Sequence, residues 1–243
     1  MIPLRDENPS GSKPVVTYVI IAACVAVFLI ELLQGERLES FIATYGVVPL
    51  KYTPQNARQF SLFGGLLLPV FTCMFLHGGV VHLLGNMWYL WIFGDNVEDQ
   101  LGHLKFLLFY LGTGVAATMV HILFNIDSRM PVVGASGAIA GVLGGYLVSY
   151  PRARVLVLLP LWIYWPIVPM PAFFVLGMWF FLQLGNGMLA IGASAETVGG
   201  VAWWAHIGGF VAGVLLIKML PKRKRRLRRP TRYDRPYHVD MRW

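Results

Sequence analysis

The chain has 243 residues, and 13% of them are charged. Because an ordinary soluble domain carries about 25% charged residues, this composition excludes a typical soluble enzyme and indicates a polytopic membrane protein, in agreement with a mean hydropathy of +0.61. The net charge of +8 is unevenly distributed, since eleven of the twenty Lys and Arg residues lie between Lys218 and Arg242.

The first half of the chain contains three candidate membrane spans, each of which needs about 20 apolar residues. Residues 15–33 form the first, which lacks a small-residue cleavage motif and is expected to remain as an anchor. Residues 80–93, which end at the polar stretch GDNVEDQLG, and residues 104–124 form the next two. Residues 63–76 are apolar but short and are interrupted by Pro69. We expect a loop there that dips into the membrane, and the alternative is a seventh span.

The second half contains the remaining three spans. Residues 132–150 form the fourth. Prolines at positions 160, 166, 169 and 171 prevent an undisturbed helix before the fifth, which we predict over residues 169–184. The Gly-rich residues 185–200 are either a mobile cap or an ordinary flexible loop. Residues 201–220 form the sixth span and lead directly into the basic tail.

Six spans place both ends of the chain on one side of the membrane. Arg152 and Arg154 lie on the same side as the basic tail, and the positive-inside rule makes that side cytoplasmic. We therefore expect a cytoplasmic segment at residues 1–14, a transmembrane domain at 15–220 and a basic cytoplasmic tail at 221–243. The tail indicates a stop signal that contacts anionic lipid rather than a nucleic-acid site, because no folded domain presents it.

Spans two, four and six enter the membrane from the opposite side, and each carries polar residues near its start. These are His82 and Asn86 in HLLGN, Ser136 in GASGAIAGVLGG and His206 in AHIGG. At about 1.5 Å of rise per residue, all four lie at a similar depth. Taken singly, each is more simply explained by helix packing or as a satisfied core side chain. Together they match the nucleophile, base and oxyanion donors of acyl transfer.

Small residues recur at intervals of four on the fourth and sixth spans. They are Gly137, Gly141 and Gly145 on the fourth span, and Gly209 and Gly213 on the sixth. Residues of this size allow two helix backbones to approach closely in lipid. We therefore expect the histidine of span six to lie against the serine of span four.

The three motifs resemble those of the rhomboid family of intramembrane serine proteases, and the resemblance covers about residues 15–220. It implies an all-α membrane protein with a six-transmembrane-helix bundle and a membrane-dipping first loop. It implies Ser136 as the nucleophile and His206 as the general base. Asn86, His82 and the backbone N–H of Ser136 would bind the oxyanion.

The resemblance also assigns roles to glycines and exposes two departures from the family. Gly134 would give the chain room before the nucleophile, and Gly137, Gly141, Gly209 and Gly213 would serve helix packing. Spans four and six contain no Asp or Glu, which fits a catalytic dyad. Leu68-Pro69 stands where many members have Trp-Arg, and Ala140 stands where some have an aromatic residue that stacks on the base. The orientation of His206 must therefore come from another residue.

The expected substrates are single-span membrane proteins that unwind near their outer end and carry a small residue before the cut. We expect no cofactor, no metal and no nucleic acid, and a multi-pass location in the plasma membrane. One alternative is a catalytically weak or inactive relative that binds membrane proteins. Another is a haem protein with His82 and His206 as axial ligands. A transporter is the third, weakened by the absence of internal sequence repeats.

Overall fold

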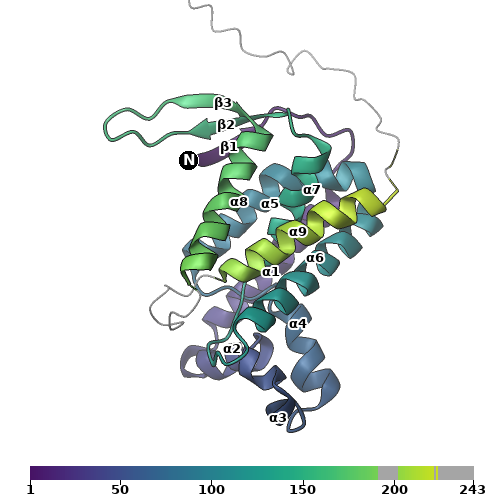
Figure 1. Ribbon diagram of the computed structural model, residues 1–243, viewed down its shortest axis with the longest axis vertical. Coiled ribbons are helices and arrows are strands. Elements are labelled where there is room, and N and C mark those ends of the chain that lie inside the picture. The colour runs from purple at the N-terminus through teal and green to yellow at the C-terminus, as the bar shows by residue number, and fades with distance from the viewer. Residues whose placement is uncertain (191–201, 222, 224–243) are drawn as a thin grey trace, which may run out of the picture.

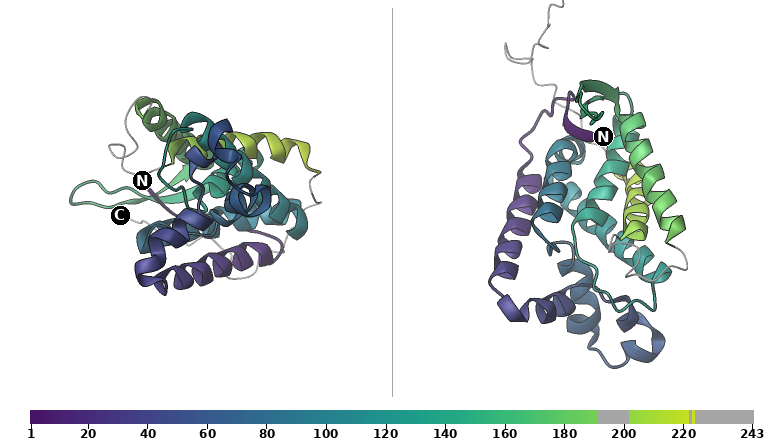
Figure 2. Two further views of the ribbon diagram at one scale, coloured as in Figure 1. Left: turned by 90° about the horizontal axis from the view of Figure 1, so that it is seen from below. Right: turned by 90° about the vertical axis from the view of Figure 1, so that its left-hand side faces the viewer.

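The computed structural model describes residues 1–190, 202–221 and 223, which form a helical bundle with a small sheet at one end (Figure 1). The long helices are α1 (Val15–Leu32), α5 (Val80–Leu101), α6 (His103–Phe124), α7 (Ser136–Ser149), α8 (Ala172–Leu189) and α9 (Trp203–Met219). The two views in Figure 2 show α1 at one edge of the bundle and α8 at another. The expected basic tail lies outside the described residues except at positions 221 and 223.

Three of the described helices, α1, α6 and α8, are both long enough and apolar enough to cross a membrane. Helices α7 and α9 are apolar but shorter, with 14 and 17 residues. Helix α5 is 22 residues long, and its last turns include the polar stretch that the sequence analysis placed after the second span. The helix therefore continues eight residues beyond position 93, where the predicted span ends.

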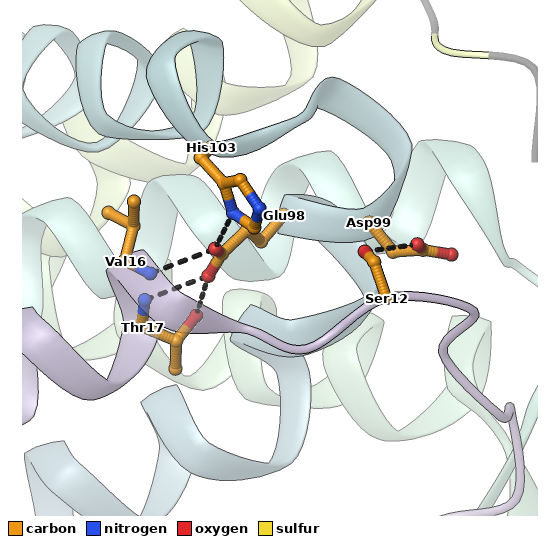
Figure 3. Close-up of polar contacts among 6 residues, drawn as sticks. All are labelled: Ser12, Val16, Thr17, Glu98, Asp99 and His103. Carbon is orange, nitrogen blue, oxygen red and sulfur yellow. Dashed lines mark hydrogen bonds and ion pairs between the residues drawn. The ribbon is translucent and has the colours of Figure 1, made fainter.

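The polar end of α5 remains helical because its carboxylates accept hydrogen bonds from residues at and just before the start of α1 (Figure 3). The Glu98 side chain is 0% exposed, and its carboxylate accepts the backbone N–H groups of Val16 and Thr17, both at 2.8 Å. It also accepts the hydroxyl of Thr17 at 2.7 Å and lies 2.6 Å from Nδ1 of His103. The first N–H groups of a helix have no partner within the helix, so Glu98 caps α1 and ties it to α5 and α6. Asp99 adds a hydrogen bond from Ser12.

The expectation of an all-α protein was wrong in one region, because three strands form an antiparallel sheet in the order β1-β2-β3. They are β1 (Ile2–Asp6), β2 (Arg154–Leu158) and β3 (Ile167–Pro171), and Val157 pairs with Val168. The prolines of β3 cannot join a helix, but an edge strand accommodates them. Val155 and Val157 alternate with more exposed residues and are buried in the core.

The turn between β2 and β3 projects from the bundle (Figure 1) and carries exposed apolar side chains, of which Trp162 is 97% exposed. Helix α8 begins at Ala172, after β3, and ends at Leu189. It therefore starts and ends later than the predicted fifth span. Of the predicted cap or loop, positions 185–189 are helical, whereas 191–200 lie outside the described residues.

The connection between α1 and α5 is built from short helices at the end of the bundle away from the sheet (Figure 1). They are η1 (Gly35–Arg37), α2 (Leu38–Tyr45), η2 (Pro49–Tyr52), α3 (Pro54–Ala57), η3 (Leu62–Leu67) and α4 (Leu68–Thr72). The segment predicted to dip into the membrane contains η3 and α4, and Phe63 is 77% exposed. Together these two helices form an apolar stretch of only 11 residues, Leu62–Thr72, which is too short for an ordinary span.

Helix α7 lies in the core, buried from Gly137 to Tyr146, and packs most extensively against α9 and α6. A Cβ atom added at Gly209 would collide with the carbonyl oxygen of Gly137, and one added at Gly213 would collide with that of Gly141. On the other side of α7, a Cβ atom at Gly141 would collide with Thr113 of α6. The backbones of α7 and α9 are therefore in direct contact, and this contact sets the relative position of the side chains they carry.

Candidate active site

The starts of α7 and α9 bring a serine and a histidine together. Ser136 is the first residue of α7, and His206 lies in the first turn of α9. Nε2 of His206 lies 2.8 Å from Oγ of Ser136, which is hydrogen-bond distance. The contact between Gly137 and Gly209 lies directly beside this pair along both helices. Two residues that are 70 positions apart in the sequence thus form one unit.

The second ring nitrogen of His206 is hydrogen-bonded to Gln183, a residue that the sequence analysis missed. Nδ1 of His206 lies 2.7 Å from Oε1 of Gln183, on α8. One turn earlier on α8, the ring of Trp179 lies 5.8 Å from the imidazole, centroid to centroid. The sequence does contain a signal, because Gln183 is a polar residue within the otherwise apolar stretch WFFLQLG. Its direction could not be inferred without the rotation of α8 about its axis.

Ser136 lies among the first backbone N–H groups of α7, because the helix begins at this residue. Ala135 occupies the N-cap position and supplies no side-chain cap. The first N–H groups of a helix have no intrahelical acceptor, and the helix dipole places partial positive charge at this end. The backbone at Ser136 is therefore suited to stabilise negative charge on a nearby oxygen.

His82 and Asn86 lie four residues apart in the first turns of α5 and face the same cavity as Ser136. Asn86 is 7% exposed. Among the described residues its Nδ2 has no hydrogen-bond partner. A buried donor without a partner is costly, so this amide is available to an acceptor that enters the cavity.

Gly134 allows His82 to lie beside the serine. A Cβ atom at position 134 would lie 2.8 Å from both Cε1 and Nε2 of His82, and 3.6 Å from Oγ of Ser136. The backbone also has φ +130 at this position, which L side chains rarely adopt. Glycine is thus required here both for space and for conformation.

The segment that leads into α5 is held by a buried carboxylate of α1. Both carboxylate oxygens of Glu31 accept the backbone N–H of His77, at 3.1 and 3.2 Å. The His77 side chain is 2% exposed, and its ring lies 5.3 Å from that of His82. Burial, reinforced by His82, lowers the pKa of His77 from its ordinary value of 6.5 to about 4. His77 is therefore neutral at pH 7, and its backbone fixes the chain just before His82.

Ser136, His206, His82 and Asn86 line one cavity of about 1100 Å³. Its described walls include Tyr89 of α5 and Trp179 of α8, and none of its lining residues is Asp or Glu. The cavity combines the Ser136 hydroxyl in contact with the His206 imidazole, the nearby His82 and Asn86, and further polar residues at Tyr89, His121, Asn125 and Ser128. This set of groups can carry out nucleophilic attack on a carbonyl and stabilise the resulting oxyanion.

Comparison with known proteins agrees with the motifs. The Rhomboid domain profile matches residues 65–223. RHOMBOID-like protein 4 of Arabidopsis thaliana is 33% identical over 218 residues, which cover 81% of this chain and 50% of that protein. Rhomboid protease GluP of Bacillus subtilis (strain 168) is 34% identical over 139 residues, covering 56% of this chain and 25% of that protein.

Presenilin-associated rhomboid-like protein, mitochondrial, of Bos taurus is 29% identical over 219 residues, covering 87% of this chain and 50% of that protein. The chain therefore spans half or less of the length of these curated relatives. The resemblance found in the sequence motifs is confirmed at the level of the family.

Proposed function

Because this chain belongs to the rhomboid family of membrane proteins, we propose that it is a serine endopeptidase that cleaves single-span membrane proteins within or near their transmembrane segment. The observation that carries the proposal is the 2.8 Å contact between Nε2 of His206 and Oγ of Ser136, in a cavity that Asn86 also lines. A serine hydroxyl is a weak nucleophile unless an adjacent base activates it, and this contact supplies the base.

In the proposed mechanism, Oγ of Ser136 attacks the scissile carbonyl carbon while His206 Nε2 accepts the hydroxyl proton. Negative charge moves to the carbonyl oxygen, where the Asn86 amide, the His82 ring and the N–H of Ser136 donate hydrogen bonds. His206 then gives its proton to the leaving amine. Water attacks the remaining acyl ester, again with His206 as the base, and restores the serine.

We further propose that α1, α5, α6, α7, α8 and α9 are six membrane spans, with residues 15–220 as the membrane domain. The support is that α5, α7 and α9 each begin near the polar groups of one cavity. In this arrangement residues 1–14 and 221–243 are both cytoplasmic. Reporter fusions at the two ends should give the same sidedness, and opposite sidedness would exclude the arrangement. The predicted location in the plasma membrane is not supported by the comparisons, because similar proteins are named as mitochondrial.

The proposed substrates follow from the shape and composition of the site. A helical segment hides its carbonyl groups in its own hydrogen bonds, so it must unwind before Ser136 can attack. The apolar walls of the cavity fit a membrane segment. The close approach of His82 to Gly134 beside Ser136 supports a small substrate residue before the cut. Lipid surrounds the enzyme, and neither a cofactor nor a metal takes part in the proposed steps.

Two alternatives from the sequence are less well supported by the geometry. A haem protein would need Nε2 or Nδ1 of His206 as an axial ligand. Both atoms are already hydrogen-bonded, Nε2 to Ser136 and Nδ1 to Gln183. A non-catalytic relative that binds membrane proteins would have no need for the contact between His206 and Ser136. That contact therefore favours the enzyme.

The test is to incubate the purified protein in lipid bilayers with a panel of single-span fusion proteins and to compare it with Ser136→Ala. We expect cleavage of at least one substrate by the wild type and by a Ser128→Ala control, and none by Ser136→Ala. A fluorophosphonate probe should label Ser136, and labelling should disappear in His206→Ala. Cleavage that persists in Ser136→Ala, or an unlabelled and inactive wild type, would refute the proposed function.

A further inference from the structure

Helix α8 brings one buried amide to the site, and we infer that Gln183 is a positioning residue that holds His206 in the tautomer and ring orientation needed by a base. This inference rests on the proposed function for its catalytic consequence. Its structural content, which concerns the protonation of the imidazole nitrogens, can be measured independently.

Gln183 is a buried polar residue, and its burial is explained by a hydrogen bond. Its side chain is 8% exposed, on a helix whose other residues are mostly apolar. Burying a polar side chain without a partner costs free energy, and a polar residue within an apolar span usually faces the interior of the bundle. The partner here is His206, since Oε1 of Gln183 lies 2.7 Å from Nδ1 of the imidazole.

The chemistry of the amide oxygen fixes the proton on the imidazole. An amide oxygen can accept a hydrogen bond but cannot donate one, so with Oε1 of Gln183 facing the ring we assign the hydrogen to Nδ1 of His206. A neutral imidazole has one N–H, which leaves Nε2 with its lone pair directed at Oγ of Ser136. This is the tautomer that can take the serine proton. The opposite tautomer would donate to the serine and could not act as its base.

The same contact persists when His206 becomes charged. After proton transfer both ring nitrogens are donors, and the Nδ1–H bond to Gln183 remains without any rotation of the ring. In a triad of serine, histidine and acid, a carboxylate fills this position. A carboxylate within a membrane segment is expensive, whereas the amide supplies an acceptor without a net charge. Gln183 thus accounts for the orientation of a base that has Ala140 in place of a stacking aromatic residue.

Packing holds α8 in the position that this contact requires. The ring of Phe180 stacks on Phe210 of α9 with centroids 4.6 Å apart. Further along α8, a Cβ atom at Gly187 would lie only 3.0 Å from Ile207. Gln183 lies between these two contacts in sequence, so α8 approaches α9 closely on both sides of it. Gln183 is not among the residues that line the cavity, and it therefore acts through His206.

The kinetic test uses Gln183→Met, which keeps the length of the side chain but removes the acceptor. General base catalysis contributes about 10²–10⁴-fold to a rate, and we expect loss of the correct tautomer to remove about 10–100-fold of this from kcat. The KM should change little, because Gln183 does not reach the substrate. Gln183→Asn is the second variant, since it keeps an amide but withdraws the oxygen from Nδ1, and the same loss is expected. The matched control is Asn186→Leu, one turn further along α8.

The spectroscopic test measures the protein labelled with ¹⁵N-histidine in lipid bilayers, with the His206 signals assigned by their absence in His206→Ala. At neutral pH we expect a hydrogen on Nδ1 and none on Nε2 in the wild type and in Asn186→Leu. In Gln183→Met the population with hydrogen on Nε2 should increase. A change in stability alone would not move this equilibrium.

Wild-type kcat and an unchanged tautomer in both Gln183 variants would overturn the inference, as would hydrogen on Nε2 in the wild type. If the wild type cleaves nothing but the tautomer depends on Gln183 as expected, the proposed function fails while the positioning role stands. If either Gln183 variant does not fold, as judged by its thermal unfolding, the other variant and the wild-type spectrum decide the outcome.

Discussion

Replacing Gly209 by Ala tests whether the backbone contact between α7 and α9 sets the geometry of the Ser136–His206 pair. The added methyl group would collide with the carbonyl oxygen of Gly137. That oxygen belongs to the backbone and cannot turn away as a flexible side chain would. The two helices must therefore separate or rotate, and Gly209 lies about one helical turn from the base.

The expected magnitude follows from the crowding. Overpacking a close-packed interior costs about 1–3 kcal/mol, and a collision with backbone belongs at the upper end. Ala gains about 1 kcal/mol over Gly within a helix, so we expect a net loss of about 2 kcal/mol in the free energy of unfolding. Displacing a catalytic group by about 1 Å can cost about 10²-fold in rate. Activity should thus fall far more than the loss of folded protein explains.

The assay compares Gly→Ala substitutions at three helix positions that differ in the room available for the added methyl group. At Gly177 of α8 an added Cβ meets nothing within 4 Å, and at Gly112 of α6 it meets Leu216 at an ordinary 3.8 Å. Gly177→Ala and Gly112→Ala should match the wild type or be up to about 1 kcal/mol more stable. Thermal unfolding in one detergent and the rate of fluorophosphonate labelling are measured for all four proteins. If Gly209→Ala labels at the wild-type rate with unchanged stability, the close contact does not position the base.

Three further results are expected. Asn86→Ala should slow cleavage about 10²–10³-fold, since it removes a donor to the developing oxyanion, and a wild-type rate would make Asn86 a packing residue. Glu98→Ala should lower the free energy of unfolding by about 2–6 kcal/mol, because the backbone N–H groups of Val16 and Thr17 lose their acceptor at about 1–3 kcal/mol each, and a loss below about 1 kcal/mol would contradict the capping role. Between pH 6.5 and 4 the unfolded chain binds a proton at His77 that the native chain does not, because burial lowers the native pKa of His77 to about 4. Stability should therefore fall as the pH is lowered through this range, and His77→Gln should flatten that part of the unfolding profile; an identical slope would exclude His77 as the cause.

Much of the arrangement could be predicted because it depends on distances along the chain. The lengths of the apolar segments place Ser136 and His206 at the starts of their helices, and the spacing of Gly209 and Gly213 indicates which faces can touch. The contact with Gln183 could not be predicted, because it depends on the rotation of α8 about its axis. The helical end of α5 was also missed, since the partners of Glu98 lie more than 80 residues earlier in the chain.

The sheet was missed for a related reason. Prolines in residues 155–171 exclude a helix but do not identify a partner strand. β2 pairs with the nearby β3 on one edge and, on the other, with the distant β1, where Ile2 lies opposite Leu158. Hydrophobic alternation over five residues is too short to distinguish such a strand from an irregular connection. A local sequence pattern therefore cannot show that β1 pairs with β2, because the two strands lie far apart in the sequence.

The place of β1 in this sheet has a consequence for biosynthesis. Asp6 accepts a hydrogen bond from the hydroxyl of Tyr146 at 2.6 Å, across 140 positions of the sequence. A ribosome that adds about 5–20 residues per second needs about 7–28 s to extend the chain by these 140 positions. Throughout that time β1 has neither its partner strand nor the tyrosine to which Asp6 is bonded. During synthesis β1 can therefore take its final place only after both α7 and β2 have been made.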